Sequence, residues 1–307
     1  EDCARAAAGA LSDGFDGRRI LEVSCPAPVT QDQIAAWASE IAGKTVTHVP
    51  VPPDALRKGM VDAGLPPSPG RARPPYQPAI RLPRRPVERG EYGTRVISHH
   101  LPEHTLAALK RTGRSKGATL HGTMTAAFLL GIGDVFGVRE MTCLSSFDLR
   151  RVVQPPLPPE TYGCFVDMLR TRHDIAGDLW AIARDVSFKL IAAIAKDQEA
   201  ASMIRLPTHR ELAMELLPTL RHRGRIDGLA ITTAGESGLG SAYGNHRLLD
   251  VTMAASLDVV GPGLIVISLE REGALQVSVC YAAHTLAAAD AMAVADRAMA
   301  ALRMAAE

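Results

Sequence analysis

The chain has 307 residues and a formal net charge of +1, from 34 basic and 33 acidic side chains. Hydrophobic residues make up 47% of it and aromatic residues only 4%, so we expect an aliphatic core in one large or two medium domains. A charge so close to zero excludes a whole-chain field that would recruit nucleic acid or an anionic membrane. No apolar run reaches the roughly 18 residues of a membrane span, so none is expected.

Five cysteines are scattered along the chain without the spacings of a metal site or a disulfide framework. We therefore expect reduced thiols in a cytoplasmic protein, with no bound metal or cofactor. The first residue is Glu1, within a helical pattern, and we expect the sequence to begin partway through a larger product.

Residues 1–67 are predicted to form a small α/β unit with helical and strand-like periodicities. In chain order, the predicted elements are a strand at 20–23, a helix between Thr30 and Gly43, a strand at 46–49 and a helix from Pro53 to Gly64. Thr30 is a suitable N-cap, and a glycine commonly follows a helix end. Residues 68–86 are rich in Pro and Arg, which predicts an extended linker.

Residues 87–307 carry a larger unit in which strands and helices are mixed. Strands are predicted at 94–100, 141–147, 163–169, 229–233, 251–259, 264–269 and 275–281, helices after Pro102, at 119–136, 180–194, 212–220 and 287–302, and turns at 261–263 and 272–273. Mixed strands with covering helices favour an α/β sandwich.

Three segments of this unit carry a resemblance to a known family. They are Gly117–Ala127, then Ser145-Ser146-Phe147-Asp148-Leu149-Arg150-Arg151, then Leu275–Tyr281. In their order and spacing they resemble the second lobe of acyltransferases related to condensation domains and chloramphenicol acetyltransferase. The resemblance is closest to the mycobacterial polyketide-associated enzymes that esterify lipid diols. It implies an α/β sandwich lobe of the chloramphenicol acetyltransferase type, with a mixed sheet. It also implies transfer of an acyl group from a coenzyme A or carrier-protein thioester to an alcohol or amine.

The family's catalytic motif, HHxxxDG, occurs nowhere in the 307 residues. A histidine in that motif would take the proton from the attacking hydroxyl or amine. His99 and His100 form a pair, but Glu103 and His104 follow and no Asp-Gly does. We interpret His100, a candidate base, as an ordinary strand residue and leave the catalytic group unknown. Zinc binding by His99, His100 and His104 is an alternative that requires the three to converge.

Asp148 and Arg150 are predicted to lie at the lobe interface. In the family, the Arg of this segment pairs with the Asp of HHxxxDG across the lobes, and the fixed donor fork of a guanidinium suits that pairing. Because that partner is not in this sequence, we expect Arg150 to pair with Asp148 or a partner chain, or to face water.

A substrate tunnel is the second feature that the resemblance implies. Its predicted lining residues are Ser145, Ser146, Thr232, Thr233 and Gly235. The segment 232–238 stands where the family has a small-residue turn near the tunnel, and glycines there would allow the thioester to approach the backbone closely. A plain turn is the alternative.

Residues 1–67 resemble the C-terminal part of NmrA-like atypical short-chain dehydrogenases, through Glu1–Ala8, Val29–Ala35 and Val49–Pro53. This resemblance implies an NAD(P)-dependent oxidoreductase as an alternative function, but the segment does not include a glycine-rich nucleotide loop. Gly238–Gly244 has a similar composition, and we interpret it as a surface loop because a strand-like sequence follows it instead of a helix.

The sequence therefore predicts an acyltransferase-like lobe without its base, with a small-molecule acyl donor and acceptor. A first lobe, a companion chain or a second copy of the chain is the expected partner, because the face near Asp148, Arg150 and residues 232–235 would otherwise expose apolar surface. Neither nucleic acid nor a membrane is an expected partner. A non-catalytic binding or assembly protein is the remaining alternative.

Overall fold

A computed structural model describes residues 30–47, 79–83, 93–148, 150, 165–195, 224–258 and 260–307. Contacts within the chain divide it into two units, Glu1–Leu56 and Arg57–Glu307. The predicted domain boundaries at residues 67 and 86 lie outside the described residues and stay predictions. So do the predicted elements at 20–23, 53–64 and 212–220.

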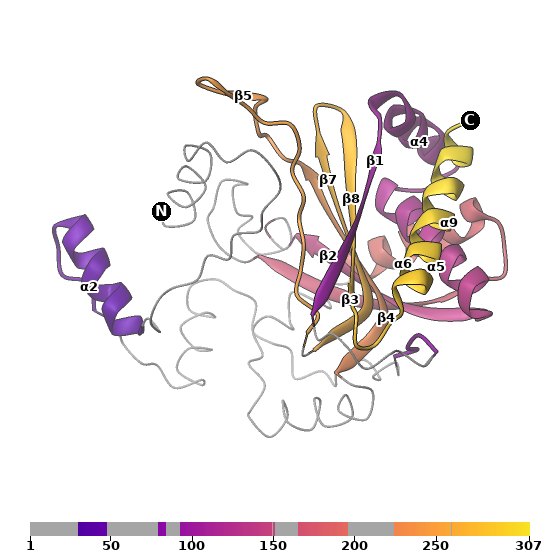
Figure 1. Ribbon diagram of the computed structural model, residues 1–307, viewed down its shortest axis with the longest axis horizontal. Coiled ribbons are helices and arrows are strands. Elements are labelled where there is room, and N and C mark those ends of the chain that lie inside the picture. Colours follow the sequence, from indigo (N-terminus) through magenta and orange to yellow (C-terminus); the bar gives the residue numbers. More distant parts are fainter. Residues whose placement is uncertain are drawn as a thin grey trace. The chain divides into compact units, whose positions relative to one another are not determined.

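The first unit contains the helix α2 (Gln31–Ala42), which begins and ends where its sequence predicts (Figure 1). The Gln33 backbone N–H donates to Thr30 Oγ1 at 3.2 Å, and the Thr30 N–H donates to Gln33 Oε1 at 2.8 Å, which together form a capping box. Gly43 ends the helix in the left-handed conformation, with φ of 61°. The strand predicted from Val46 is wrong where the structure describes it, because Val46 and Thr47 join no ladder among the described residues.

The second unit is built on a six-stranded mixed sheet with the order β1-β8-β7-β4-β2-β3 (Figure 1). The strands are β1 (Thr94–Leu101), β2 (Glu140–Asp148), β3 (Val166–Asp174), β4 (Arg225–Glu236), β7 (Gly261–Arg271) and β8 (Ala274–Ala282). β2, β4 and β7 run parallel, while β1, β8 and β3 run antiparallel to their neighbours. The carboxyl ends of β2, β4 and β7 therefore meet at one edge of the sheet.

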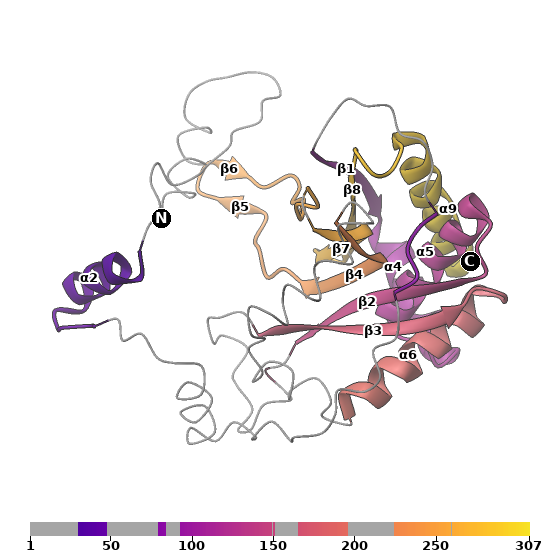
Figure 2. The same cartoon turned by 90° about the horizontal axis from the view of Figure 1, so that it is seen from below.

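Four helices lie together on one face of this sheet (Figures 1 and 2). They are α4 (Glu103–Ser115), α5 (Leu120–Phe136), α6 (Leu179–Ala195) and α9 (Ala288–Ala306). α5 lies between α6 and α9, which explains why its sequence is apolar around nearly its whole circumference. Glycines allow the close approach: a Cβ at Gly131 would lie 2.7 Å from the Val294 carbonyl oxygen of α9, and one at Gly122 would lie 2.6 Å from the Ala183 carbonyl oxygen of α6.

The main core lies between the sheet and the helices. The strand side chains in it include Met141, Cys143, Leu229, Ile231, Leu264, Val266, Val277 and Val279. Since side chains alternate along a strand, Ser145 continues the helix-facing row of β2 and Thr233 that of β4. Ser146 and Thr232 belong to the opposite face. The sheet thus divides the predicted tunnel residues between its two faces.

The apolar segment before β7 is not the predicted strand. Residues 251–258 have no strand structure, and Leu257 packs instead on Cys280 and Ala282 in a small second cluster. Its backbone is held from both sides: the Leu257 N–H donates to Thr94 Oγ1 at 2.7 Å, and Arg225 Nη2 donates to the Leu257 carbonyl at 2.6 Å. A segment that packs on a sheet is apolar for the same reason as a buried strand, which is contact with other apolar side chains. Composition alone therefore does not distinguish the two.

The predicted turn at 261–263 is also wrong, because these residues are the start of β7 and pair with β4. A Cβ at Gly263 would lie 2.9 Å from the Gly228 carbonyl oxygen of β4, so a glycine is needed there for packing and not for a turn. The turn at 272–273 is confirmed. Glu272 and Gly273 have φ of 49° and 77° and join β7 to β8 as a two-residue hairpin loop.

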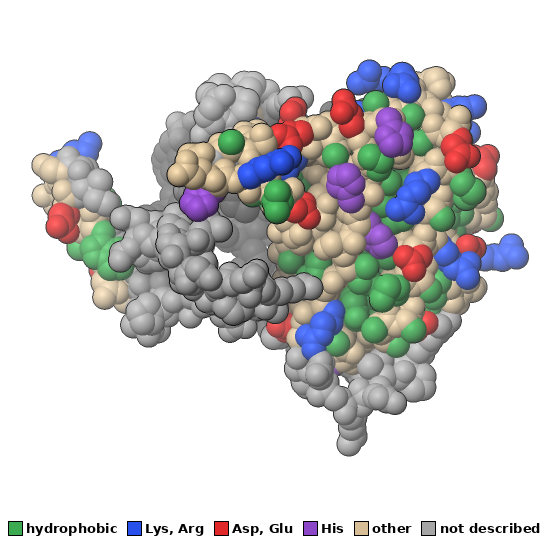
Figure 3. Space-filling view, turned by 45° about the horizontal axis from the view of Figure 1, so that its top comes forward, with side chains coloured by type: hydrophobic (Ala, Val, Ile, Leu, Met, Phe, Trp, Pro, Cys, Tyr) green, Lys and Arg blue, Asp and Glu red, His purple; other side chains and the backbone are tan. Residues whose placement is uncertain are grey.

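Gly238–Gly244 contains the first strand, β5 (Ala242–Tyr243), of a small hairpin whose second strand is β6 (His246–Arg247). Gly244, with φ of 61°, forms its turn, and no helix follows, so the segment lacks the form of a dinucleotide loop, as predicted. Among the described helices none is both long and apolar enough to cross a bilayer. The cytoplasmic location stays a prediction. Figure 3 shows one face of the molecule, on which the described basic and acidic side chains are interspersed.

Candidate functional site

Two hydroxyl groups near the carboxyl ends of β2 and β4 converge on one imidazole ring from α5. His121 Nε2 lies 2.9 Å from Ser145 Oγ, and His121 Nδ1 lies 3.0 Å from Thr233 Oγ1. We call these three residues the hydroxyl–imidazole cluster. It joins the start of a helix to two neighbouring parallel strands, which is where ligand sites commonly form in open α/β sheets.

The start of α5 is fixed by its cap and by α6, and this holds His121 in place. Thr119 Oγ1 accepts a hydrogen bond from the Gly122 N–H at 3.0 Å, and the Thr119 N–H donates to Ser187 Oγ at 3.0 Å. Ser187 in turn donates to the Ala183 carbonyl of α6 at 2.7 Å. The imidazole therefore projects from a backbone that is anchored within the helix layer.

The His121 ring is neutral at physiological pH. Burial lowers its pKa to about 4. A neutral imidazole has one N–H donor and one lone pair, so one of the two hydroxyls donates to the ring and the other accepts from it. Each ring nitrogen already has a protein hydroxyl as its hydrogen-bond partner, so neither nitrogen is left to bond a ligand directly.

The two hydroxyls differ in exposure. The Ser145 side chain is buried, with 1% of its surface exposed, whereas Thr233 and His121 are partly exposed. Thr233 and His121 are therefore the members of the cluster with some surface open to solvent.

Asp148 and Arg150 pair with each other at the end of β2. Arg150 Nη1 lies 3.1 Å from Asp148 Oδ1, which also accepts from the Arg150 backbone N–H at 3.0 Å. The guanidinium lies 5.0 Å from the centroid of the Phe165 ring, a cation–π distance. Pairing with Asp148 was one of the predicted arrangements. The placement of the two residues at a lobe interface stays a prediction.

The remaining predicted tunnel residues are not part of the cluster. Ser146 and Thr232 belong to the opposite face of the sheet, and Gly235 lies at an irregularity in β4, with φ of 74°. A Cβ at Gly235 would meet no atom within 4 Å, so its backbone conformation, and not crowding, favours glycine. Their role in a tunnel stays a prediction.

The histidines of the His99-His100 segment do not converge. His99 faces α9, with Nε2 3.9 Å from Asp296 Oδ1, and burial lowers its pKa. His100 is exposed on the opposite face of β1, as alternation requires, and His104 is exposed on α4. Within the described ranges no three residues of metal-binding type form a group that could hold an ion.

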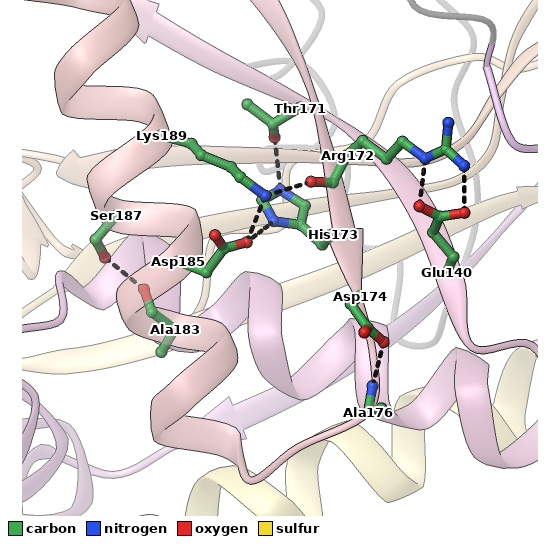
Figure 4. Close-up of polar contacts among 10 residues, drawn as sticks. All are labelled: Glu140, Thr171, Arg172, His173, Asp174, Ala176, Ala183, Asp185, Ser187 and Lys189. Carbon is green, nitrogen blue, oxygen red and sulfur yellow. Dashed lines mark hydrogen bonds and ion pairs between the residues drawn. The ribbon is translucent and has the colours of Figure 1, made fainter.

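A second imidazole network ties the edge strand β3 to α6 (Figure 4). His173 Nδ1 lies 2.8 Å from Asp185 Oδ2, and His173 Nε2 lies 2.7 Å from Thr171 Oγ1. Lys189 Nζ, 2.7 Å from the same Asp185 oxygen, completes it. His173 is fully buried, so no ligand reaches it, and we interpret this network as structural.

Sequence reasoning did not single out His121. It lies within Gly117–Ala127, one of the segments of the family resemblance, but a histidine near a helix start has no distinctive spacing. The available signal was the Thr119 cap, which places His121 in the first turn. Its partners lie 24 and 112 residues further along the chain, and only the sheet register brings them to it.

Comparison with known proteins finds a family profile that matches a central part of the chain. Residues 92–235 match the sequence profile described as the phthiocerol/phthiodiolone dimycocerosyl transferase C-terminus. No curated protein matches the chain.

Solved structures share the fold. The cyclization-docking bidomain EpoB from Sorangium cellulosum is 19% identical, with a TM-score of 0.56 over 93% of this chain and 54% of that one. The trichothecene 15-O-acetyltransferase TRI3 from Fusarium sporotrichioides is 10% identical, with a TM-score of 0.55 over 75% of this chain and 50% of that one. The epimerization domain of tyrocidine synthetase B is 15% identical, with a TM-score of 0.52 over 90% of this chain and 64% of that one.

The six-stranded mixed sheet with its helix layer is therefore the fold of condensation-domain and acyltransferase C-terminal lobes. The predicted resemblance and fold class are confirmed. The chain spans about half to two thirds of the length of these solved structures. None of these findings supports the NmrA-like resemblance of residues 1–67 or an oxidoreductase function.

Proposed function

We propose that this chain acts as the second lobe of an acyltransferase, which moves an acyl group from a coenzyme A or carrier-protein thioester to an alcohol or amine. The observation that carries the proposal is the family match over residues 92–235, which spans β1 to β4 with α4, α5 and α6. In the reaction the acceptor oxygen or nitrogen attacks the thioester carbonyl, the new C–O or C–N bond forms, and the C–S bond breaks. A base takes the acceptor's proton, and the departing thiolate is protonated.

The base is the part of this chemistry that the lobe does not supply. HHxxxDG is not in the sequence, and His121, which lies near the carboxyl ends of the parallel strands, has a protein hydroxyl bonded to each ring nitrogen. We therefore assign the base to a first lobe, in the same polypeptide or in a companion chain. The present lobe would contribute one wall of the substrate site, with Ser145 and Thr233 at the ends of β2 and β4 and Asp148 and Arg150 beside them.

Photo-crosslinking tests this assignment on the chain itself. A pantetheine thioester with a photoreactive acyl group is irradiated with the folded chain, and the labelled peptides are identified by mass spectrometry. We expect labelling at 145–148 and 232–236, and competition by unlabelled acyl-coenzyme A but not by ADP, which lacks the pantetheine arm. The same reaction on urea-unfolded chain is the control.

Labelling that is absent, or that matches the unfolded control, would overturn the proposal. That result would favour the second candidate, a non-catalytic binding or assembly protein. The sequence feature that favours this candidate is the missing HHxxxDG motif.

A further inference from the structure

One stripe of α6 faces solvent and carries large apolar side chains. The opposite side of the helix is buried and packs on α5 and β3. Arg184, Phe188 and Ile191 follow one another along the outer stripe, about one helical turn apart, with Phe188 73% and Ile191 60% exposed. Two large apolar side chains in neighbouring turns differ from the single exposed apolar residues that are common on protein surfaces. Because α6 lies at the margin of the helix layer, beside the edge strand β3 (Figure 2), the stripe forms a projecting ridge.

Basic side chains lie at the start of this stripe. Residues 104–117, which include most of α4, contain four Lys or Arg residues and no acidic residue. The last of these residues, Lys116, lies close to Arg184, because a Cβ at Gly117 would be 3.9 Å from Arg184 Cδ. The Asp178 carboxylate accepts from two backbone N–H groups at the start of α6, and both cations also stabilise it. Within the described ranges neither Lys116 nor Arg184 forms an ion pair, so this end of the stripe has a net positive charge.

Charge and shape distinguish the possible occupants of the stripe. A second copy of the chain, bound through the same face, would place these cations opposite each other, which is unfavourable. A stable protein–protein contact buries roughly 800 Å² on each partner, whereas the apolar part of the stripe is two side chains on a projecting helix. An anionic lipid surface requires no complementary shape. Apolar side chains enter the boundary between head groups and acyl chains, and cations bind the head groups.

We propose that the exposed stripe of α6, together with Lys116, attaches the chain to an anionic lipid surface. In the bound state Phe188 and Ile191 enter the acyl boundary, and the two cations bind the head groups. The formal charge of +1 on the whole chain does not oppose this attachment, because the attraction falls off within a Debye length and depends on the local charge. Attachment to lipid goes beyond the proposed acyl transfer and does not depend on it.

Flotation with lipid vesicles tests the proposal on the full chain. We expect the chain to float with phosphatidylcholine vesicles that contain phosphatidylglycerol, more weakly in added salt, and to stay behind with vesicles of phosphatidylcholine alone. Phe188→Ser should lower the partition coefficient about tenfold. Arg184→Gln should lower it about fivefold. Met304→Ser is the matched control, because it removes a side chain that is 67% exposed beside Arg303 on α9, and it should change nothing.

A tryptophan on the stripe locates the contact. Phe188→Trp adds a fluorophore, and brominated lipid in the vesicles should quench its emission beyond any loss in the parent chain. No flotation, flotation that Phe188→Ser leaves unchanged, or no additional quenching would each overturn the proposal, and the first result would favour an acidic protein as the partner. Equal urea midpoints for the parent and the variants show that the fold is intact. A failed crosslinking experiment would overturn the proposed function and leave the flotation result unchanged.

Discussion

His121 is partly exposed and His173 is fully buried, and their neighbours give the two rings different chemistry. His173 faces the Asp185 carboxylate, which holds its Nδ1 proton and favours the charged ring, although burial outweighs this effect and lowers the pKa. His121 faces two hydroxyls, which offer no charge, and burial alone lowers its pKa to about 4. His173 therefore has a charged hydrogen-bond partner, and His121 has neutral ones.

The pH dependence of stability follows from the His121 pKa. It is about 4 in the folded chain against the ordinary value of 6.5, so between these values the unfolded chain binds more protons. The free energy of unfolding should therefore fall as the pH falls from 6.5 towards 4, by at most about 1.4 kcal/mol per pH unit from this group. The Gln side chain of His121→Gln does not titrate. We therefore expect the free energy of unfolding of this variant to fall by about 1–2 kcal/mol less than that of the parent chain between pH 6.5 and 5, as measured by urea titrations.

The comparison is internally controlled, because His173 is present in both proteins and its lowered pKa contributes the same pH dependence to each. Parallel pH profiles for the two chains would mean that the His121 ring is as solvated in the folded state as in the unfolded state.

Ser145 and Ser146 are neighbours in sequence and belong to opposite faces of β2. Ser145→Ala removes a buried partner of His121 and leaves a ring nitrogen unsatisfied, which should lower the free energy of unfolding by about 1–3 kcal/mol. Ser146→Ala is the matched control and should change it by no more than about 0.5 kcal/mol. Chemical denaturation measures both, and equal costs would contradict the assignment of the two faces.

At the scale of the elements, three neighbouring strands are joined by one buried carboxylate. Asp227 of β4 is fully buried, lies 2.5 Å from Arg170 Nε of β3, and accepts a hydrogen bond from Thr142 of β2. The Thr142 hydroxyl also accepts from the Ile80 N–H at 2.8 Å, so the segment at 79–83 is held at the same place. This polar tie fixes how β3, β2 and β4 lie side by side.

Removing that charge should destabilise the lobe strongly. Asp227→Asn leaves Arg170 without its carboxylate, and breaking a buried pair in this way costs about 3–5 kcal/mol. Glu140→Gln breaks the Arg172–Glu140 pair, whose side chains are 45% and 44% exposed, and should cost less than about 1 kcal/mol. The two variants are compared by urea unfolding, and similar costs would show that the Asp227 pair is solvated.

Local patterns located most of these elements. α2, α5 and the 272–273 turn lie where caps, periodicity and turn residues predict them, because those signals act over a few residues. The errors at 251–259 and 261–263 have the opposite cause. An apolar segment can join a sheet as a strand or pack on the sheet without joining it, and a glycine can serve a turn or a close contact. In both cases the outcome depends on the residues that pack against the segment.

At the scale of the whole molecule, this lobe has the fold of an acyltransferase C-terminal half, and HHxxxDG does not occur in its sequence. It also exposes apolar side chains on β3 and α6, among them Met168, Phe188 and Ile191. The solved structures that share its fold are longer than this chain. In the proposed function, a companion lobe would supply the base.

We expect the chain alone to turn over no acyl-coenzyme A, because a general base contributes typically about 10²–10⁴ in rate. Release of free thiol from acyl-coenzyme A, with octanol or octylamine as acceptor, should match the rate in buffer. His100→Ala is the control and should change nothing, because His100 is an exposed residue of β1. Turnover that this substitution abolishes would place the base in the present chain after all.

The sequence by itself determined the fold class, the family resemblance of the larger unit, and the position of most helices and strands. It also placed Ser145 and Thr233 among the candidate site residues. Only the tertiary structure decided that these two meet at His121 while Ser146 and Thr232 turn away. The physical reason is that the register of β2 against β4, and the packing of α5 on both, are set by contacts across the whole lobe. No short segment of the sequence contains that information.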